Sequence, residues 1–249
     1  MSLSRESNLC GIILKKTIYH ETSLILDIFT PVYGSIPVMA KGVRREKSQV
    51  LGLLEILNEL EITLYKNPAS EWYIFKNAEL IKSHLYETNF QTGILMQAAA
   101  EIYRQLIMAN SDFDSLYELL EQYLVYIRTV PQNGIAVFWR FMLRLFKLLG
   151  IELDTTSCVI CHENHDFVAY YPQQHGFICR TCLRPVHEDR VVRMNREQAE
   201  LIAQLHRIGN LLPELIINKT TITQINRIFL AHLSENFHQR FYLKTLEML

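Results

Sequence analysis

Four of the chain's five cysteines form two Cys-x-x-Cys pairs, Cys158/Cys161 and Cys179/Cys182. Both sulfurs of such a pair can point at one centre, and two pairs complete a tetrahedron of thiolates around Zn²⁺. Four sulfurs fill the coordination sphere and leave no position for water or substrate. The spacing therefore predicts one structural zinc ion per chain, which braces the fold and performs no catalysis.

The alternatives to zinc for the same cysteines are a redox-active pair, an iron–sulfur cluster, and unligated buried thiols. Three histidines lie close in sequence and are expected on the surface, since four cysteines need no substitute ligand: His162, His165 and His175. We expect Gly176 to supply the tight turn ahead of the second pair. Cys10 stands alone in an apolar stretch and is predicted to be a core residue.

The densest cationic stretch is "AKGVRREKS", which holds Lys41, Arg44, Arg45 and Lys47. Basic side chains at this density on a loop suit contacts with backbone phosphates, which do not depend on nucleotide sequence. Lys15 and Lys16 can extend the same surface. The alternative is an ordinary solvated turn. Three aromatic residues are candidates for base stacking, although core positions are expected for them: Phe29, Tyr33 and Tyr65.

A second basic feature lies in "AVFWRFMLRLFKLLG", where Arg140, Arg144 and Lys147 share one side of a predicted helix. Phe141 and Leu148 lie beside this stripe. An apolar surface next to a cationic one suits a partner peptide that combines hydrophobic side chains with carboxylates. The alternative is a core helix with one solvated edge.

The chain has 249 residues, and the candidate residues fall in three successive parts of it that differ in sequence pattern. Residues 8 to about 80 contain five short stretches with strand character, which predict a small barrel or sandwich. From about Thr88 to Gly150, three segments show helical spacing, with a cap expected at Ser111 or Asp112. The cysteine segment follows, with a short strand expected at "DFVAYY". Further helices are expected over 195–212 and 221–249.

Composition, net charge and the absence of known motifs limit the classes of protein to which this chain can belong. Hydrophobic residues make up 49% and charged residues 20%, as in folded globular proteins. The net charge of −1 means that an anionic partner has to meet a local basic patch.

The N-terminus shows no secretion signal and no apolar stretch reaches bilayer length, so we expect a cytoplasmic protein with no membrane span. No nucleotide-binding or hydrolase motif is present, which favours a binding protein.

Several stretches resemble the RecO family of bacterial DNA repair and recombination mediators. They are "ETSLILDIFTPVYGSIPVMAKGVRREKS" (Glu21–Ser48), "FMLRLFKLLGIELDTTSCVIC" (Phe141–Cys161) and "HGFICRTC" (His175–Cys182). The tail "QRFYLKTLEML" is similar to the family's closing helix, with Leu243-Lys244-Thr245 in place of Leu-Lys-Ser. A second departure is His175-Gly176, where many relatives have two glycines.

The resemblance implies an α+β fold of several domains: an N-terminal OB-fold barrel over 1–82, then an α-helical domain over 83–249 that carries a zinc-ribbon-like segment at 155–187. It implies binding to single- and double-stranded DNA, strand annealing, and RecA loading together with RecR onto strands coated by the single-stranded-DNA-binding protein (SSB). Lys41, Arg44, Arg45 and Lys47 match the family's basic loop. The resemblance also implies that Arg140 and its apolar neighbours lie where the helical domain receives the acidic SSB tail. Some members lack the cysteines, which supports a structural metal.

Two other functions are the alternatives to a mediator. One is a zinc-dependent enzyme that processes nucleic acid, which needs an open metal position and nearby carboxylates. The other is a zinc-ribbon transcription factor, which would bind one duplex sequence selectively.

Overall fold

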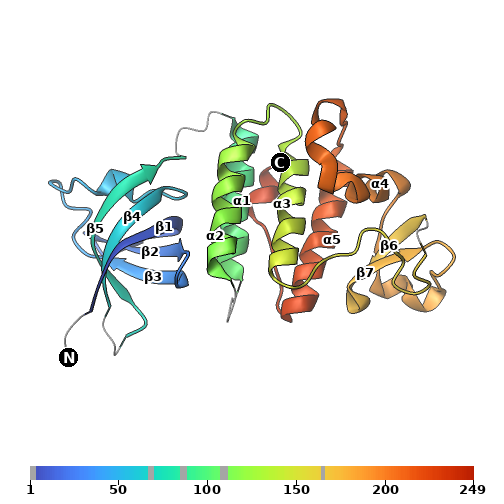
Figure 1. The fold of residues 1–249 in the computed structure, drawn as a ribbon, viewed down its shortest axis with the longest axis horizontal. Coiled ribbons are helices and arrows are strands. Elements are labelled where there is room, and N and C mark those ends of the chain that lie inside the picture. Colours follow the sequence, from blue (N-terminus) through green and yellow to red (C-terminus); the bar gives the residue numbers. More distant parts are fainter. Residues whose placement is uncertain (1–3, 67–69, 85–88, 107–111, 164–165) are drawn as a thin grey trace. The chain divides into compact units, whose positions relative to one another are not determined.

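The computed structural model describes residues 4–66, 70–84, 89–106, 112–163 and 166–249 (Figure 1). The chain forms two compact units. The first contains Met1–Arg128 together with Thr245–Met248, and the second contains Thr129–Lys244. Two helices thus belong to the same unit as the N-terminal strands. A domain boundary after residue 82 stays a prediction.

The first unit begins with five strands: β1 (Ser4–Tyr19), β2 (Ser23–Thr30), β3 (Gly34–Ala40), β4 (Glu59–Lys66) and β5 (Tyr73–Lys82). They close into a barrel in the order β1-β2-β3-β5-β4, in which β3 and β5 run parallel and the other neighbours antiparallel. This closed five-stranded order is that of an OB-fold. The expected OB-type barrel is confirmed, and the sandwich alternative is excluded.

Closure of the barrel depends on β1, which pairs with β4 through its first half and with β2 through its second. The change of partner falls at Ile12, which lies opposite Glu59 on β4 and Phe29 on β2, and a register shift follows between Ile13 and Lys15. Alternate residues along each strand fill the interior, among them Leu26, Val38 and Leu64, all fully buried.

Two helices belong to the barrel unit, α1 (Phe90–Gln105) and α2 (Phe113–Ile127). Asp112, one of the two residues expected to cap α2, accepts a hydrogen bond from the backbone NH of Ser115. The other candidate, Ser111, lies outside the described residues. The ring of Phe29 meets that of Tyr103 edge-on at 5.0 Å. Tyr117 donates a hydrogen bond to the buried carboxylate of Glu59 at 3.0 Å. These contacts fasten both helices to the barrel.

The second unit contains α3 (Gly134–Leu148), α4 (Arg196–Gln204) and α5 (Lys219–Phe237), with a three-stranded sheet in the order β7-β6-β8. The strands are β6 (Phe167–Tyr171), β7 (Gly176–Cys179) and β8 (Val192–Arg193). The buried indole of Trp139 on α3 donates a hydrogen bond to Asn226 on α5 at 2.8 Å. Short 3-10 helices occur at Leu51–Leu53, Pro172–Gln174, Pro185–Arg190, Leu205–Asn210, Leu212–Glu214 and Thr245–Met248. None of the described helices combines the length and apolar character needed to cross a bilayer.

The expected helix over 221–249 is wrong in its second half. α5 ends at Phe237 because His238 adopts a left-handed backbone with a φ of 51°, and its NH bonds back to the carbonyl of Ser234. The chain then runs without helix to Thr245, whose NH and hydroxyl donate to the carboxylate of Glu101 on α1 at 3.2 and 2.6 Å. The hydroxyl retained at this position thus fixes the end of the chain to the first unit.

A buried histidine joins three parts of the second unit. His232 on α5 is 1% exposed, and its Nδ1 accepts a hydrogen bond from the hydroxyl of Tyr170 on β6 at 2.8 Å. Its Nε2 donates to the carbonyl of Ile151 at 2.6 Å, which assigns the proton of the neutral ring to Nε2. Burial lowers the pKa of His232 to about 4, and the hydrogen bond to Ile151 opposes this only in part.

The lowered pKa of His232 predicts that the protein loses stability as the pH falls. Because the folded-state pKa lies below the ordinary value of about 6.5, the unfolded chain takes up a proton first as the pH falls. We expect His232 to lower the free energy of unfolding by at most about 3 kcal/mol between pH 6.5 and 4, and to have no effect above that window. His232→Asn should be less stable at pH 7 but lose less stability on acidification, measured by urea denaturation at several pH values.

The matched control is His206→Asn, an exposed position of the same unit, which should keep the full acid loss of the unaltered chain. An equal acid loss in His232→Asn would contradict the assignment.

Candidate functional site

The four cysteines predicted to bind zinc come together in the second unit. Their Sγ atoms all lie within 4.8 Å of one another, and Cys161 and Cys179 are 3.8 Å apart. A tetrahedron with Zn–S bonds of about 2.3 Å has sulfur–sulfur edges of about 3.8 Å. The donor set and its spacing fit a four-coordinate zinc ion.

The backbone shapes each pair into the same kind of turn. The NH of His162 donates to the carbonyl of Cys158 at 2.8 Å, and the NH groups of Cys182 and Leu183 donate to that of Cys179 at 3.2 Å. The NH of Cys179 also points at the sulfur of Cys158, 3.4 Å away. An NH group that points at a sulfur, as this one does, stabilises the thiolate form that binds metal.

Ionisation of the thiols is strongly unequal. Burial raises the pKa of Cys179, but hydrogen bonds from Thr181 and neighbouring groups outweigh burial and lower this pKa to about 6. Burial and the neighbouring thiols raise the pKa of Cys182 to about 12. Four thiolates at this separation repel one another, so a divalent cation is what would hold all four deprotonated together.

The hairpin between the pairs differs from expectation in one detail. The strand expected at "DFVAYY" is β6, but the left-handed turn residue is His175, with a φ of 54°, and not Gly176. Gly176 is required for another reason, because a Cβ there would overlap the side chain of Val159 in the first cysteine turn. His162 and His175 are exposed, as expected, whereas His165 lies outside the described residues.

A groove of about 380 Å³ lies on the outer face of the barrel. Its lining comes from β1, β2, β3, β5 and the segment before β5: Tyr19, Ile25, Met39, Lys41, Ser70, Trp72 and Ile74. These side chains point away from the core because their strand neighbours, such as Leu24, Val38 and Tyr73, point inward. The barrel therefore presents an outward apolar surface with a basic residue beside it.

The predicted basic loop begins at this groove. Lys41 lines it, and Arg45 and Lys47 are exposed on the bend that follows β3. Arg44 is half-buried and has a structural contact: its Nη1 donates to the carbonyls of His20 and Glu21 at 3.1 and 2.9 Å. Arg44 thus ties the basic loop to the turn between β1 and β2.

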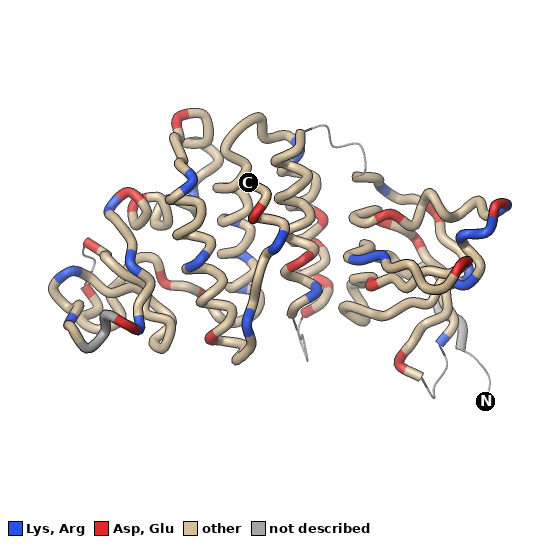
Figure 2. The backbone as a smooth tube through the Cα atoms, turned by 180° about the vertical axis from the view of Figure 1, so that it is seen from behind, with Lys and Arg blue, Asp and Glu red and all other residues tan. Residues whose placement is uncertain are grey.

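Within the described ranges, charged residues elsewhere do not form a continuous basic field. Lys and Arg positions are scattered among acidic ones along both units (Figure 2). Lys15 is exposed and lies opposite Asp27 on β2, whereas Lys16 forms an ion pair with Glu55 at 2.5 Å. The local basic loop, and not the overall charge, is what an anionic partner would meet.

The aromatic residues named from the sequence have different surroundings. Phe29 is fully buried, Tyr33 is 39% exposed, and Tyr65 is half-buried on β4. Two aromatic residues of the groove, Tyr19 and Trp72, were missed. The alternation of "EWYIFK" contains the signal for Trp72, because Trp72 and Ile74 alternate with the inward Tyr73 and Phe75.

The stripe on α3 is partly open to solvent. Arg144, Lys147 and Leu148 are exposed, and Arg140 is half-buried. Lys147 approaches Glu152 at 3.8 Å. Phe141 is 3% exposed and packs against Phe138 with ring centroids 6.1 Å apart, so it is a core residue and not part of the exposed surface beside the stripe.

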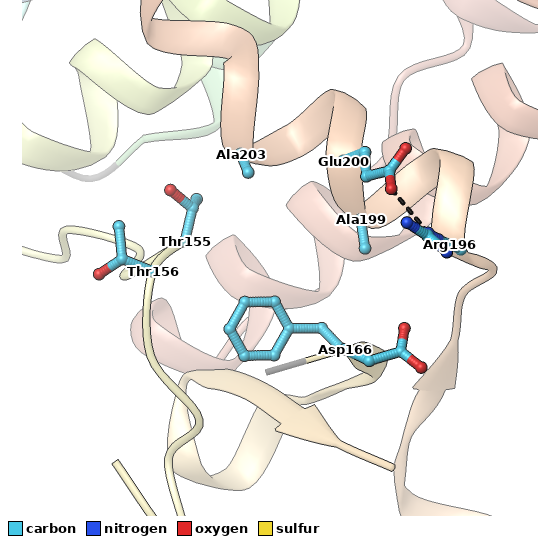
Figure 3. A pocket seen from close by; sticks show the side chains of 8 residues that line it. Thr155, Thr156, Asp166, Arg196, Ala199, Glu200 and Ala203 are labelled. Carbon is cyan, nitrogen blue, oxygen red and sulfur yellow. Dashed lines mark hydrogen bonds and ion pairs between the residues drawn. The ribbon is translucent and has the colours of Figure 1, made fainter. Parts of the chain in front are cut away.

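Another pocket, of about 490 Å³, lies between α4 and the start of β6 (Figure 3). Phe167, Ala199 and Ala203 give it an apolar lining. Its charged groups are satisfied by neighbours, since Arg196 pairs with Glu200 at 2.7 Å and Asp166 pairs with Arg180 at 3.0 Å. Nothing in this arrangement points to a particular ligand.

Comparison with known proteins covers both parts of the chain. The family described as Recombination protein O N terminal matches residues 1–84, and the one described as Recombination protein O C terminal matches residues 88–245.

Individual relatives agree with the family matches. The protein named DNA repair protein RecO from Thermoanaerobacter sp. (strain X514) is 22% identical over 95% of this chain and 96% of its own length. The protein of that name from Halalkalibacterium halodurans is 21% identical over 95% of this chain and 94% of its own length. The one from Chloroherpeton thalassium is 32% identical over 60% of this chain and 58% of its own length. The chain belongs to the Recombination protein O (RecO) family of DNA repair and recombination proteins.

Proposed function

We propose that this chain is a non-catalytic mediator that binds single- and double-stranded DNA, promotes annealing and, with RecR, helps RecA load onto SSB-coated strands. One observation carries the DNA-binding step: an exposed basic bend begins at the outer groove of a closed OB-type barrel. Barrels of this kind bind nucleic acid along such a groove. The family membership supports a role in repair and recombination, in the bacterial cytoplasm at the nucleoid.

The mechanism makes and breaks no covalent bond. Lys41, Arg45 and Lys47 neutralise backbone phosphates and release the counterions condensed on them. Two strands held in this way repel each other less, which favours base pairing. Arg44 contributes charge beside them while it holds the β1–β2 turn in place.

Recruitment to coated strands is assigned to α3. The guanidinium groups of Arg140 and Arg144 pair with carboxylates of the acidic SSB tail, and Leu148 offers apolar contact beside them. Lys147 adds positive charge at the exposed end of the stripe, and Phe141 supports the surface from below.

The zinc ion, in this proposal, holds the two cysteine turns together and takes no part in DNA chemistry. Four sulfur ligands favour this role over that of a hydrolase, which would need an open coordination position. The cluster lies in the second unit, whereas the groove and basic loop lie in the first.

The first test concerns the basic loop. The double variant Arg45→Ala/Lys47→Ala should bind single-stranded DNA more weakly, and the slope of log K against log salt should become shallower by about 1.4, since each phosphate contact contributes about 0.7. Fluorescence anisotropy with a labelled oligonucleotide measures both quantities. Arg207→Ala/Lys219→Ala, which removes two exposed charges of the second unit, should keep the original slope. An unchanged slope in the loop variant would remove the loop from the DNA site.

The second test concerns α3. Arg140→Glu should weaken binding of an acidic SSB-tail peptide at least about tenfold, because it places a carboxylate where the tail carries its own. Anisotropy with a labelled peptide gives the affinity, and circular dichroism checks the fold. The control Arg207→Glu makes the same charge change at another exposed position. Retained peptide affinity in Arg140→Glu refutes the docking step.

The third test concerns the metal. The purified chain should contain one zinc ion by elemental analysis. The double variant Cys158→Ser/Cys179→Ser should lose the ion and unfold at a lower temperature, with DNA affinity roughly unchanged because the binding surface lies in the barrel unit. Cys10→Ser is the control and should keep the metal. Zinc retained by the double variant would exclude a site built from these four sulfurs.

A further inference from the structure

The four clustered cysteines differ in how far solvent reaches them. Cys158 and Cys179 are fully buried, whereas Cys161 and Cys182 are half-buried, so each Cys-x-x-Cys pair has one inner and one outer member. A small dissolved reagent can meet the outer sulfurs and not the inner ones. Any covalent modification of the cluster therefore has to begin at an outer cysteine.

One outer sulfur lies against an inner sulfur of the other pair. The Sγ atoms of Cys161 and Cys179 are 3.8 Å apart, and they need to approach to about 2.0 Å to form a disulfide. The hydroxyl of Thr181 lies 3.0 Å from the Sγ of Cys179 and helps to hold that sulfur in place. Cys161 thus combines access from solvent with a partner thiol that is itself shielded from solvent.

The two cysteine turns are also held together by contacts that involve no metal ligand. Tyr170 on β6 is hydrogen-bonded to His232, which in turn donates to the carbonyl of Ile151. Val159 of the first turn packs against Gly176 at the start of β7, where a Cβ would overlap it. These contacts persist without an ion, so a chemical change at the sulfurs does not scatter the four cysteines. A reversible modification is possible in such a frame.

We propose that the cysteine cluster is a peroxide-sensitive modification site, in which Cys161 is oxidised first and then forms a reversible disulfide with Cys179. The inference rests on the proposed structural zinc ion and adds a chemical control to that site. Oxidation releases the ion and lowers the stability of the second unit, whereas the barrel unit contains neither cysteine and keeps its properties.

The reaction consumes one hydrogen peroxide molecule and two thiolates. The sulfur of Cys161 attacks a peroxide oxygen, the O–O bond breaks, and hydroxide leaves, so that Cys161 becomes a sulfenic acid. The sulfur of Cys179 then attacks that of Cys161, and a second hydroxide leaves as the S–S bond forms. Two protons from solvent convert both hydroxides to water. The two sulfurs lose two electrons, which the peroxide oxygens gain.

Release of the ion follows from the loss of two ligands. The sulfurs of a disulfide carry no negative charge, so only Cys158 and Cys182 remain as thiolates. Two thiolates do not supply the four-coordinate sphere that a structural zinc site requires. A dithiol reductant reopens the disulfide by exchange and restores the ligand set.

The test uses the full-length, zinc-loaded chain and hydrogen peroxide. One zinc ion should be released for each Cys161–Cys179 disulfide formed. A colorimetric chelator measures the ion, and peptide mass spectrometry after alkylation of the remaining thiols identifies the disulfide. Dithiothreitol with added zinc should restore both the ion and the melting temperature. Affinity for single-stranded DNA should stay unchanged throughout, and Cys10→Ser should respond to peroxide as the unaltered chain does.

Two variants form a matched pair, because each removes one outer ligand. Cys182→Ser should still form the Cys161–Cys179 disulfide. Cys161→Ser should keep Cys179 reduced under the same peroxide, since the sulfur that takes up the oxidant is gone. Disulfide mapping reads out both variants even where the loss of a ligand weakens zinc binding.

The inference is overturned if peroxide leaves zinc bound, if the mapped disulfide joins two cysteines of the same pair, or if Cys179 is oxidised as readily in Cys161→Ser as in Cys182→Ser. Failure of the proposed zinc role looks different: elemental analysis would find no zinc in the purified chain before any peroxide is added.

Discussion

The first unit depends on a single bent strand that closes its barrel. β1 pairs with β4 and then with β2, and Ile12 is the residue at which it pairs with both. Closure removes the free strand edges and fixes which side chains face outward. The groove residues Ile25, Met39 and Ile74 form an outer row of paired side chains only because β2, β3 and β5 are held in this register. A slip of one residue would replace it with core side chains.

The second unit is organised around buried polar contacts and thiols. His232 uses both ring nitrogens to connect α5 with β6 and with the chain after α3. The hairpin of β6 and β7 in turn brings the second cysteine pair to the first, where Val159 packs against Gly176. The strands β6 and β7 are buried along their whole length, and these short, directional contacts fix how they pack against α5 and the first cysteine turn. A metal ion at the four sulfurs would add a further cross-link at the far end of this hairpin.

Much of this organisation is predictable from local patterns. Alternating residues indicate the strands, helical spacing and Asp112 indicate α2, and the cysteine spacing indicates one cluster. The end of α5 is not predictable in this way, because Phe241 and Leu243 continue an apolar pattern although His238 has already turned the chain. The groove was missed because its lining depends on pairing between strands far apart in sequence. For the same reason, the contact between Arg44 and the β1–β2 turn is not visible in "AKGVRREKS".

The return of the chain end to the first unit has a mechanical consequence. The polypeptide passes between the units after Arg128 and again after Lys244, and Thr245 is fastened to Glu101. A protease that nicks the first of these connections separates the chain into two fragments, and Thr245 of the second fragment would still be hydrogen-bonded to Glu101 of the first. Tension applied to the two termini would load the Thr245 anchorage before it reached the helices that precede it.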